Sequence, residues 1–141
     1  MLGVTAAPVL ERFRLDERRV ADARRQQILL VEDDEHVRLL LVLTLELAGH
    51  EVHAASNAED ALACAGLLPD LDLVVTDVCL PRGSGVELVE TLRAQRDDIA
   101  VLYITGHFEE TTARLGLDRE TPRLRKPFLP GELIAAVAAM V

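Results

Sequence analysis

A small set of polar side chains stands at the ends of the apolar runs in this sequence. Glu32 and Asp33 follow the first run, Asp77 ends the third, and Thr105 and Lys126 follow the last two. Carboxylates that converge repel each other unless a cation lies among them, and their oxygen atoms suit Mg²⁺. A carboxylate can also act as a nucleophile, while an ammonium group and a hydroxyl can hold phosphoryl oxygens. These residue types predict a site at which an aspartate becomes phosphorylated.

An alternation of strands and helices would have to position these side chains. Apolar runs of the kind found in buried strands alternate with longer stretches of helical periodicity, and turn residues separate them. Segment 78–85, with Pro81, Gly83 and Gly85, is predicted to be a loop. Five strand–helix units favour a parallel sheet with helices on both faces. The predicted strands are residues 28–31, 51–54, 72–77, 99–104 and 122–125, and the predicted helices are residues 36–48, 57–66, 86–94, 109–117 and 131–140.

The carboxyl ends of parallel strands share one edge of the sheet, and ligands bind at this edge near the point where the strand order reverses. Four of the five predicted strands end in one of the residues suited to chemistry. The first strand contributes Glu32 and Asp33, the third Asp77, the fourth Thr105 and the fifth Lys126. The topology therefore predicts that these side chains meet.

The composition limits the class of protein. The 141 residues fit one domain, and half of them are apolar although only 3% are aromatic, so aliphatic side chains must form the core. The apolar runs are shorter than the ~18–20 residues of a membrane span, and the chain does not begin with a signal-peptide pattern. Cys64 and Cys79 lack the spacing of a zinc site or a disulfide framework. We expect a cytoplasmic protein with reduced thiols.

Charge also limits the partners. The net charge is −9, and the basic residues gather near the start, where residues 1–27 hold six arginines and four acids. The more acidic remainder would repel nucleic acid and an anionic membrane, so neither is an expected partner. The basic head, residues 1–27, could contact a polyanion, or it could be a solvated helix or tail. Lys126 is the only lysine in the chain, which singles out its position.

Four sequence blocks carry a resemblance to a known family: Ile28–Glu35, Asp77–Pro81 with Gly85, Thr105-Gly106 and Lys126–Phe128. In this order and at these separations, they resemble the receiver domains of two-component response regulators, above all receivers that stand alone or are attached to hybrid sensor kinases. The resemblance implies an α/β, flavodoxin-like (βα)5 fold, a doubly wound parallel sheet of strand order 2-1-3-4-5. The receiver domain would cover residues 28–141, after a helical or disordered N-terminal extension at residues 1–27.

The resemblance also implies a mechanism. A histidine kinase or a histidine phosphotransfer protein would donate its phosphoryl group to Asp77, with Mg²⁺ as the cofactor. Asp33 would bind Mg²⁺ directly, Glu32 would hold it through water, Asp77 would also belong to the metal site, and the backbone carbonyl of Cys79 would complete the protein ligands. The neighbouring Asp34 would be peripheral.

The resemblance also implies that other positions transmit the signal or set the lifetime of the phosphoryl group. Lys126 would pair with the phosphoryl group, its bond to Pro127 would be cis, and Thr105 would shift toward the phosphate. Receivers commonly have an aromatic residue three positions before this lysine, where this chain has Arg123, so Arg123 either acts by charge or is only solvated. Cys79 and His107 stand where members of the family tune the lifetime of the phosphoryl group.

The first predicted helix has more apolar residues than one core-facing stripe requires. If one row faces the sheet, a second row of leucines points away from it, and a spare apolar stripe indicates a contact. Either the helical bundle that carries the phosphohistidine docks on this stripe, as the resemblance implies, or the head covers it with Val9, Leu10, Phe13 and Val20. The predicted core-facing row is Val37, Leu40, Leu41, Leu45 and Ala48, and the outward row is Leu39, Leu43 and Leu47.

Rival functions require other residues. A non-phosphorylated pseudo-receiver would be a binding module, but such a domain usually lacks Asp33, Asp77 or Lys126, and all three are present. A haloacid-dehalogenase-type phosphatase needs a second acid two residues after its nucleophile, where this chain has Cys79. Neither G-x-G-x-x-G nor a P-loop is present, which argues against a nucleotide-binding domain. We therefore predict a signalling domain rather than an enzyme, with self-phosphorylation and slow autodephosphorylation as its only chemistry.

The last predicted helix ends where the chain ends, so we expect a receiver without an output domain. Such a receiver would act through protein contacts or relay phosphate between histidines, or it would be a piece of a hybrid kinase. A homodimer stays open as an alternative.

Overall fold

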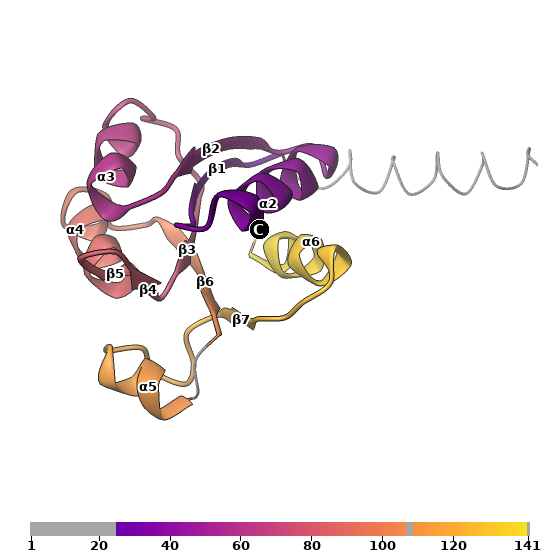
Figure 1. The fold of residues 1–141 in the computed structure, drawn as a ribbon. Coiled ribbons are helices and arrows are strands. Elements are labelled where there is room, and N and C mark those ends of the chain that lie inside the picture. The colour runs from indigo at the N-terminus through magenta and orange to yellow at the C-terminus, as the bar shows by residue number, and fades with distance from the viewer. Residues whose placement is uncertain (1–24, 107–108, 141) are drawn as a thin grey trace, which may run out of the picture.

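A computed structural model describes residues 25–106 and 109–140 of the chain. They form a five-stranded parallel sheet with helices on both faces (Figure 1). The strand order is β2-β1-β3-β6-β7, which confirms the predicted flavodoxin-like order 2-1-3-4-5. The strands of the sheet are β1 (Gln27–Val31), β2 (Glu51–Ala55), β3 (Leu73–Asp77), β6 (Ala100–Thr105) and β7 (Arg123–Arg125), and the helices are α2 (Glu35–Leu47), α3 (Ala58–Gly66), α4 (Gly85–Gln95), α5 (Glu109–Arg114) and α6 (Pro130–Ala139).

Two parts of the chain with a sequence-based prediction lie outside the described residues. They are most of the predicted N-terminal extension, residues 1–24, and His107. Within residues 25–106 and 109–140, none of the helices combines the length and the apolar content that a bilayer crossing requires.

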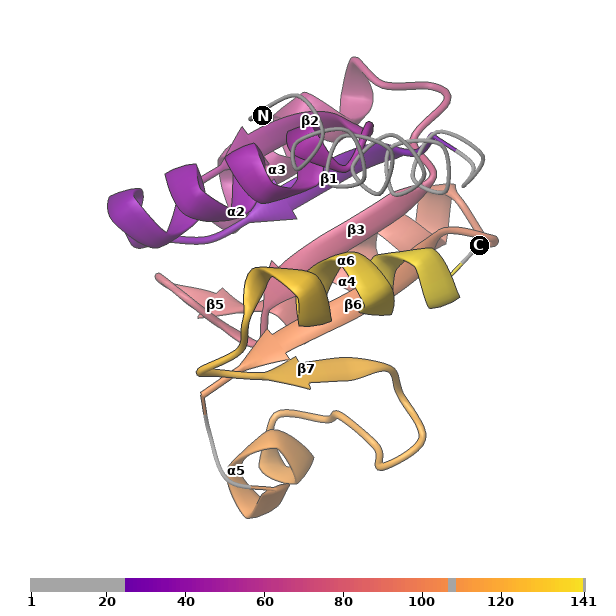
Figure 2. The same cartoon turned by 90° about the vertical axis from the view of Figure 1, so that its right-hand side faces the viewer.

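Side chains that alternate along the central strands give the domain two cores. In β1, Ile28 and Leu30 face one side of the sheet and Leu29 and Val31 face the other, and all four are fully buried. α2 and α6 cover the first side and pack against each other, whereas α3 and α4 cover the second (Figures 1 and 2). Because both faces of these strands are buried, they appear in the sequence as nearly continuous apolar runs.

Short polar side chains begin three of the helices. Asp34, Asn57 and Ser84 are the N-caps of α2, α3 and α4, and each accepts a hydrogen bond from the backbone N–H three residues later, at 3.0, 2.8 and 3.1 Å. All three caps stand in connections that leave the carboxyl ends of strands. They fix the backbone along the edge where a ligand is expected.

Two parts of the chain differ from the prediction, the segment after β3 and the end of α5. Segment 78–85 is not a plain loop, because β4 (Cys79–Leu80) and β5 (Gly83–Ser84) form an antiparallel hairpin with a two-residue turn. Strands of two residues are too short to show a periodicity. α5 ends at Arg114, earlier than predicted, and Gly116 follows with a φ of 92°, a conformation in which glycine ends helices.

The prediction for Leu40 was wrong. Leu40 is 57% exposed, whereas Leu41, Thr44 and Leu45 form the row of α2 that faces the sheet. Successive residues turn by about 100° around a helix, so Leu40 and Leu41 cannot both face the same narrow core. Leu40 therefore joins the outward stripe, where Leu39, Leu43 and Leu47 are also exposed, as the sequence predicted.

His50 ties the start of β1 to the connection before β2. Its Nδ1 atom accepts a hydrogen bond from the backbone N–H of Gln26 at 3.0 Å, and the residue is buried. Burial lowers the pKa of the His50 imidazole below its ordinary value of 6.5. Because Nδ1 can accept a hydrogen bond only without a proton, the fold requires the neutral ring.

We expect His50 to make the free energy of unfolding fall below about pH 6.5. The unfolded state then binds a proton that the folded state does not, so the contribution of His50 is complete above pH 6.5 and is lost as the pH falls through the lowered folded-state pKa. Urea unfolding at about pH 7.5 and about pH 5.5 should show a smaller loss for His50→Gln than for the wild type. His36→Gln, at an exposed position, should behave like the wild type. Equal losses in all three proteins would contradict this role.

Candidate functional site

The residues suited to chemistry come together at the C-terminal edge of the sheet. Carboxylate oxygens of Glu32, Asp33 and Asp77 lie within 4.8 Å of one another. The Nζ atom of Lys126 lies 3.0 Å from Oε2 of Glu32 and 3.2 Å from Oδ1 of Asp77. Asp33, Asp77, Thr105 and Lys126 line a pocket of about 290 Å³, together with Ile104, Gly106 and Cys79.

Hydrogen bonds that involve backbone groups at the strand ends hold this arrangement. Oε1 of Glu32 accepts a hydrogen bond from the N–H of Asp34 at 3.2 Å, and the guanidinium of Arg38 donates to the carbonyl oxygen of Glu32 at 3.1 Å. The N–H of Lys126 donates to the carbonyl oxygen of Thr105 at 2.8 Å, and the peptide bond that follows Lys126 is cis, as the resemblance implied. Arg38 was missed by the sequence analysis, because it reaches the site only through the turn between β1 and α2.

Burial and like charge set the electrostatics of the carboxylates. Glu32 and Asp77 are only 1% and 6% exposed, whereas Asp33 is exposed. Burial, together with the neighbouring Glu32, raises the pKa of Asp77 to about 8, although Lys126 opposes the shift. Burial also acts to raise the pKa of Glu32, but hydrogen bonds with Asp77 and Lys126 outweigh it and leave this pKa lowered. The two buried carboxyl groups therefore resist carrying full charge together.

The donor set fits a divalent cation. Two buried carboxylates and an exposed one face a single ammonium group, so the cluster has more negative than positive charge. Burial acts to lower the pKa of Lys126, yet the charges of Asp77 and Glu32 raise it, so this ammonium stays charged. Carboxylate and carbonyl oxygens with an open side for water are the ligands that Mg²⁺ prefers. Asp33, on the exposed side, leaves that space.

Gly85 lets α4 begin directly against the end of β3. A Cβ atom on Gly85 would overlap the carbonyl oxygen of Asp77 and would lie 3.1 Å from Cγ2 of Thr76. The N–H of Gly85 also donates to the carbonyl oxygen of Val78 at 2.7 Å. The backbone of Asp77 is thus held in place by a contact that only glycine permits.

Arg123 is more than a solvated residue. It is half-buried, and its guanidinium donates to the carbonyl oxygen of Thr121 at 3.3 Å, to Oγ1 of Thr112 at 3.4 Å and to the carbonyl oxygen of Asp118. These bonds connect β7 to α5 and to the segment between them. At the position where the family commonly has an aromatic ring, this chain therefore has an arginine that is tied to its surroundings by hydrogen bonds.

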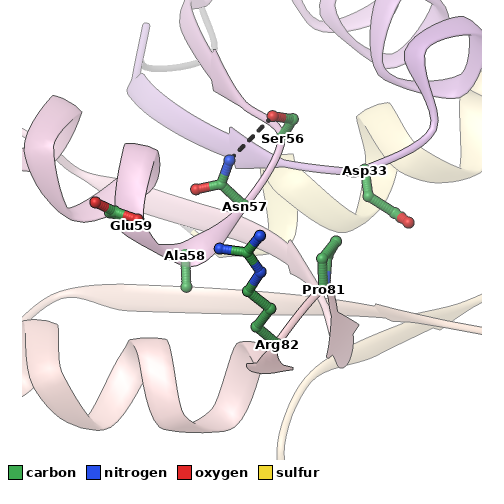
Figure 3. A pocket seen from close by; sticks show the side chains of 7 residues that line it. All are labelled: Asp33, Ser56, Asn57, Ala58, Glu59, Pro81 and Arg82. Carbon is green, nitrogen blue, oxygen red and sulfur yellow. Dashed lines mark hydrogen bonds between the residues drawn. The ribbon is translucent and has the colours of Figure 1, made fainter.

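A larger pocket adjoins the acidic site and was missed by the sequence analysis (Figure 3). Its volume is about 580 Å³, and Asp33 lies on the walls of both pockets. Its residues come from three separate connections that share no sequence motif. They are Asp33, Ser56, Asn57, Ala58, Glu59, Pro81 and Arg82.

Comparison with curated proteins finds relatives of two kinds. The chain is 38% identical over 117 residues to the alkaline phosphatase synthesis transcriptional regulatory protein PhoP of Bacillus subtilis, which covers 82% of this chain and 48% of that protein. It is 33% identical over 137 residues to the sensor kinase CckA of Brucella abortus, which covers 96% of this chain and 14% of that protein. The chain thus spans about half the length of the first relative and a much smaller part of the second.

Solved structures show the same fold. The chemotaxis protein CheY4 of Vibrio cholerae has a TM-score of 0.75 at 28% identity, over 84% of this chain and 100% of that one. A response regulator receiver protein from Sinorhizobium medicae has a TM-score of 0.72 at 29% identity, over 83% and 94%. Residues 28–138 match the family model of the response regulator receiver domain. This chain therefore belongs to the response regulator receiver domain family of two-component signal transduction.

Proposed function

We propose that this receiver accepts a phosphoryl group from a partner phosphohistidine onto Asp77. Phosphorylation then changes its protein contacts, or the receiver passes the phosphate on to another histidine. The observation that carries this proposal is the cluster of three carboxylates within 4.8 Å, with Lys126 at 3.0 and 3.2 Å from two of them. The receiver domain is residues 28–141, and residues 1–27 are an N-terminal extension.

Mg²⁺ is the cofactor that we propose for this site. Asp33 and Asp77 would bind it directly, Glu32 through water, and the backbone carbonyl of Cys79 would be the remaining protein ligand. The bound ion would neutralise charge on the nucleophile and on the incoming phosphoryl group. In support, Asp33, Asp77 and Cys79 line one pocket, and a carboxylate oxygen of the buried Glu32 lies within 4.8 Å of those of Asp33 and Asp77.

The chain's own residues would carry the transfer step. An ionised Oδ atom of Asp77 attacks phosphorus, so that an O–P bond forms while the N–P bond to histidine breaks and its electron pair returns to the imidazole nitrogen. Lys126, already 3.2 Å from Asp77, turns to the phosphoryl oxygens, and the hydroxyl of Thr105 binds another of them. Slow attack by water on the acyl phosphate later resets the domain, so the lasting product is a change of state.

The partner that we propose is a histidine kinase or a histidine phosphotransfer protein docked on α2. Leu39, Leu40, Leu43 and Leu47 are 59%, 57%, 48% and 85% exposed, and α2 begins two residues after Asp33. A helical bundle on this stripe could therefore bury apolar surface and bring its histidine to the acidic pocket. We propose that the domain does not itself bind nucleic acid, because its charge is strongly negative. We also propose that it works in the cytoplasm.

Leu43→Asp should slow phosphotransfer from the cognate kinase at least about tenfold, because it places a charge in the buried part of the docked helix. Labelling by acetyl phosphate should be unchanged, since Leu43 is exposed and does not line the acidic pocket. Transfer rates for both donors, measured by intact mass, check this. Leu67→Asp, at an exposed leucine at the end of α3, is the matched control and should leave both rates unchanged. Equal losses with both donors for Leu43→Asp would refute docking on α2.

Incubation of the full chain with acetyl phosphate, with and without Mg²⁺, tests the proposed function directly. A single adduct that requires both Mg²⁺ and Asp77 would support it. If no adduct forms, titration with beryllofluoride distinguishes a short-lived phosphate from a non-phosphorylated pseudo-receiver, because only a competent site binds this phosphoryl mimic.

A further inference from the structure

Arg82 has a backbone conformation that favours glycine. It is the second residue of the two-residue turn between β4 and β5, it follows Pro81, and its φ is 62°. Turns that have proline first and a positive φ at the second position usually place glycine or asparagine second, because a Cβ atom is crowded at positive φ. Among the described residues, Arg82 is the only non-glycine residue with a positive φ. A strained backbone conformation costs free energy and is most often found at functional sites, so we infer that the charged side chain of Arg82 has a function.

The guanidinium of Arg82 is not engaged elsewhere. Lys126 pairs with Glu32 and Asp77, and Arg38 donates to the carbonyl oxygen of Glu32. In the part of the chain that the structure describes, Arg82 forms neither a hydrogen bond nor an ion pair, although it is exposed at the same edge of the sheet. It is therefore the cation at this edge that is available to a ligand.

The guanidinium lies over the larger pocket. Figure 3 shows that it reaches from the hairpin toward Asn57 and Ala58, where α3 begins, while the carboxylate of Asp33 points away from it. The pocket wall also includes the hydroxyl of Ser56 and the first turn of α3, where the N–H of Asp60 already donates to Asn57 and the preceding N–H groups favour anions. Glu59, the other acid on the wall, forms no ion pair with Arg82 within the described residues. The side of the pocket between Arg82 and the start of α3 therefore has donors that suit a carboxylate, whereas the wall at Asp33 does not.

We propose that this pocket binds a carboxylate side chain of the protein that donates the phosphoryl group, with Arg82 as its ion partner. The proposal rests on the function proposed above. Asp33 borders both pockets, so a donor whose phosphohistidine enters the small pocket also covers the larger one. The strongly negative chain repels an acidic donor at most other places, and Arg82 makes this place an exception. Arg82 thus selects donors with an acidic residue near the phosphohistidine and takes no part in the bond exchange.

Synthetic phosphohistidine peptides test this selection without knowledge of the natural donor. In one series a single glutamate is moved through the positions on both sides of the phosphohistidine, and each peptide has a partner with glutamine at that position. Each peptide is prepared with phosphoramidate, desalted, and mixed with the full chain and Mg²⁺. The rate of phosphorylation is followed by intact mass.

For at least one position, the glutamate peptide should phosphorylate the wild type about tenfold faster than its glutamine partner. This ratio should fall to about one in Arg82→Asn, since asparagine tolerates positive φ but has no charge, and it should be kept in part in Arg82→Lys. Acetyl phosphate has no carboxylate, so it should phosphorylate all three proteins at the same rate, which shows that the acidic site is intact.

The outcomes separate the two proposals. If neither acetyl phosphate nor any peptide phosphorylates the wild type, the proposed function fails and the carboxylate pocket falls with it. If phosphorylation occurs but no glutamate position is preferred, or if the preference persists in Arg82→Asn, the pocket proposal is overturned while the proposed function stands.

Discussion

Asp77→Asn should abolish Mg²⁺-dependent phosphorylation by acetyl phosphate. Asparagine has nearly the same shape as aspartate, but its amide is not a nucleophile, so no acyl phosphate can form. The wild-type chain should gain one phosphoryl group by intact mass in the presence of Mg²⁺, and Asp77→Asn should gain none. Asp70→Asn removes an exposed acid between α3 and β3 and should behave like the wild type.

The missing adduct of Asp77→Asn should not result from loss of folding. Asp77 and Glu32 are buried carboxyl groups that share Lys126 and resist carrying full charge together, so replacement of Asp77 by asparagine should leave the free energy of unfolding unchanged or higher without Mg²⁺. Urea unfolding of both proteins checks this. A full adduct in Asp77→Asn would show that phosphate is attached elsewhere and would overturn the assignment of Asp77.

Gly85→Ala should lower the free energy of unfolding by about 2–4 kcal/mol. The new Cβ atom would overlap the carbonyl oxygen of Asp77, which is backbone and cannot rotate away, so either α4 or the end of β3 must move. Because the overlap is with Asp77 itself, the fraction that still folds should also be phosphorylated more slowly. Urea unfolding and labelling by acetyl phosphate measure the two effects.

Gly66→Ala is the matched control for this prediction. Gly66 is the last residue of α3, and outside its chain neighbours and the backbone of its own helix no atom lies within 4 Å of the position that its Cβ would take. Alanine has the higher helix propensity, so Gly66→Ala should be neutral or stabilising by up to about 1 kcal/mol. If Gly85→Ala were as stable as Gly66→Ala, the close approach of α4 to β3 would not be important to the fold.

The fold and the composition of the acidic site could be predicted because both depend on simple rules. β1 and β3 are buried on both faces, so residues 28–31 before Glu32 and residues 73–75, two positions before Asp77, are continuous apolar runs. Parallel strands end at one edge, which brings Asp77 and Glu32 together with Lys126, although 94 positions separate Glu32 from Lys126 in the sequence. Neither inference required the geometry of a loop.

What could not be predicted depends on loop geometry or on small rotations. Arg38 reaches the carbonyl oxygen of Glu32 only because the turn into α2 has one particular path. Arg82 lies over a pocket because a hairpin of two-residue strands directs it there, and such short strands have no periodic signal. Leu40 was assigned to the core although it lies about 100° from Leu41 around α2, a difference that an apolar run of leucines conceals.

The short strand β7 has a consequence for how copies of this receiver can associate. It ends the sheet with only three residues, two of which are Arg123 and Arg125. A brief edge that carries like charges is a poor template for a second sheet, because few backbone groups can pair and the arginines of two copies repel. A homodimer of this receiver would therefore not form by pairing of β7 with β7. The strand that brings Lys126 to the acidic site thus also protects the sheet against edge-to-edge aggregation at this end.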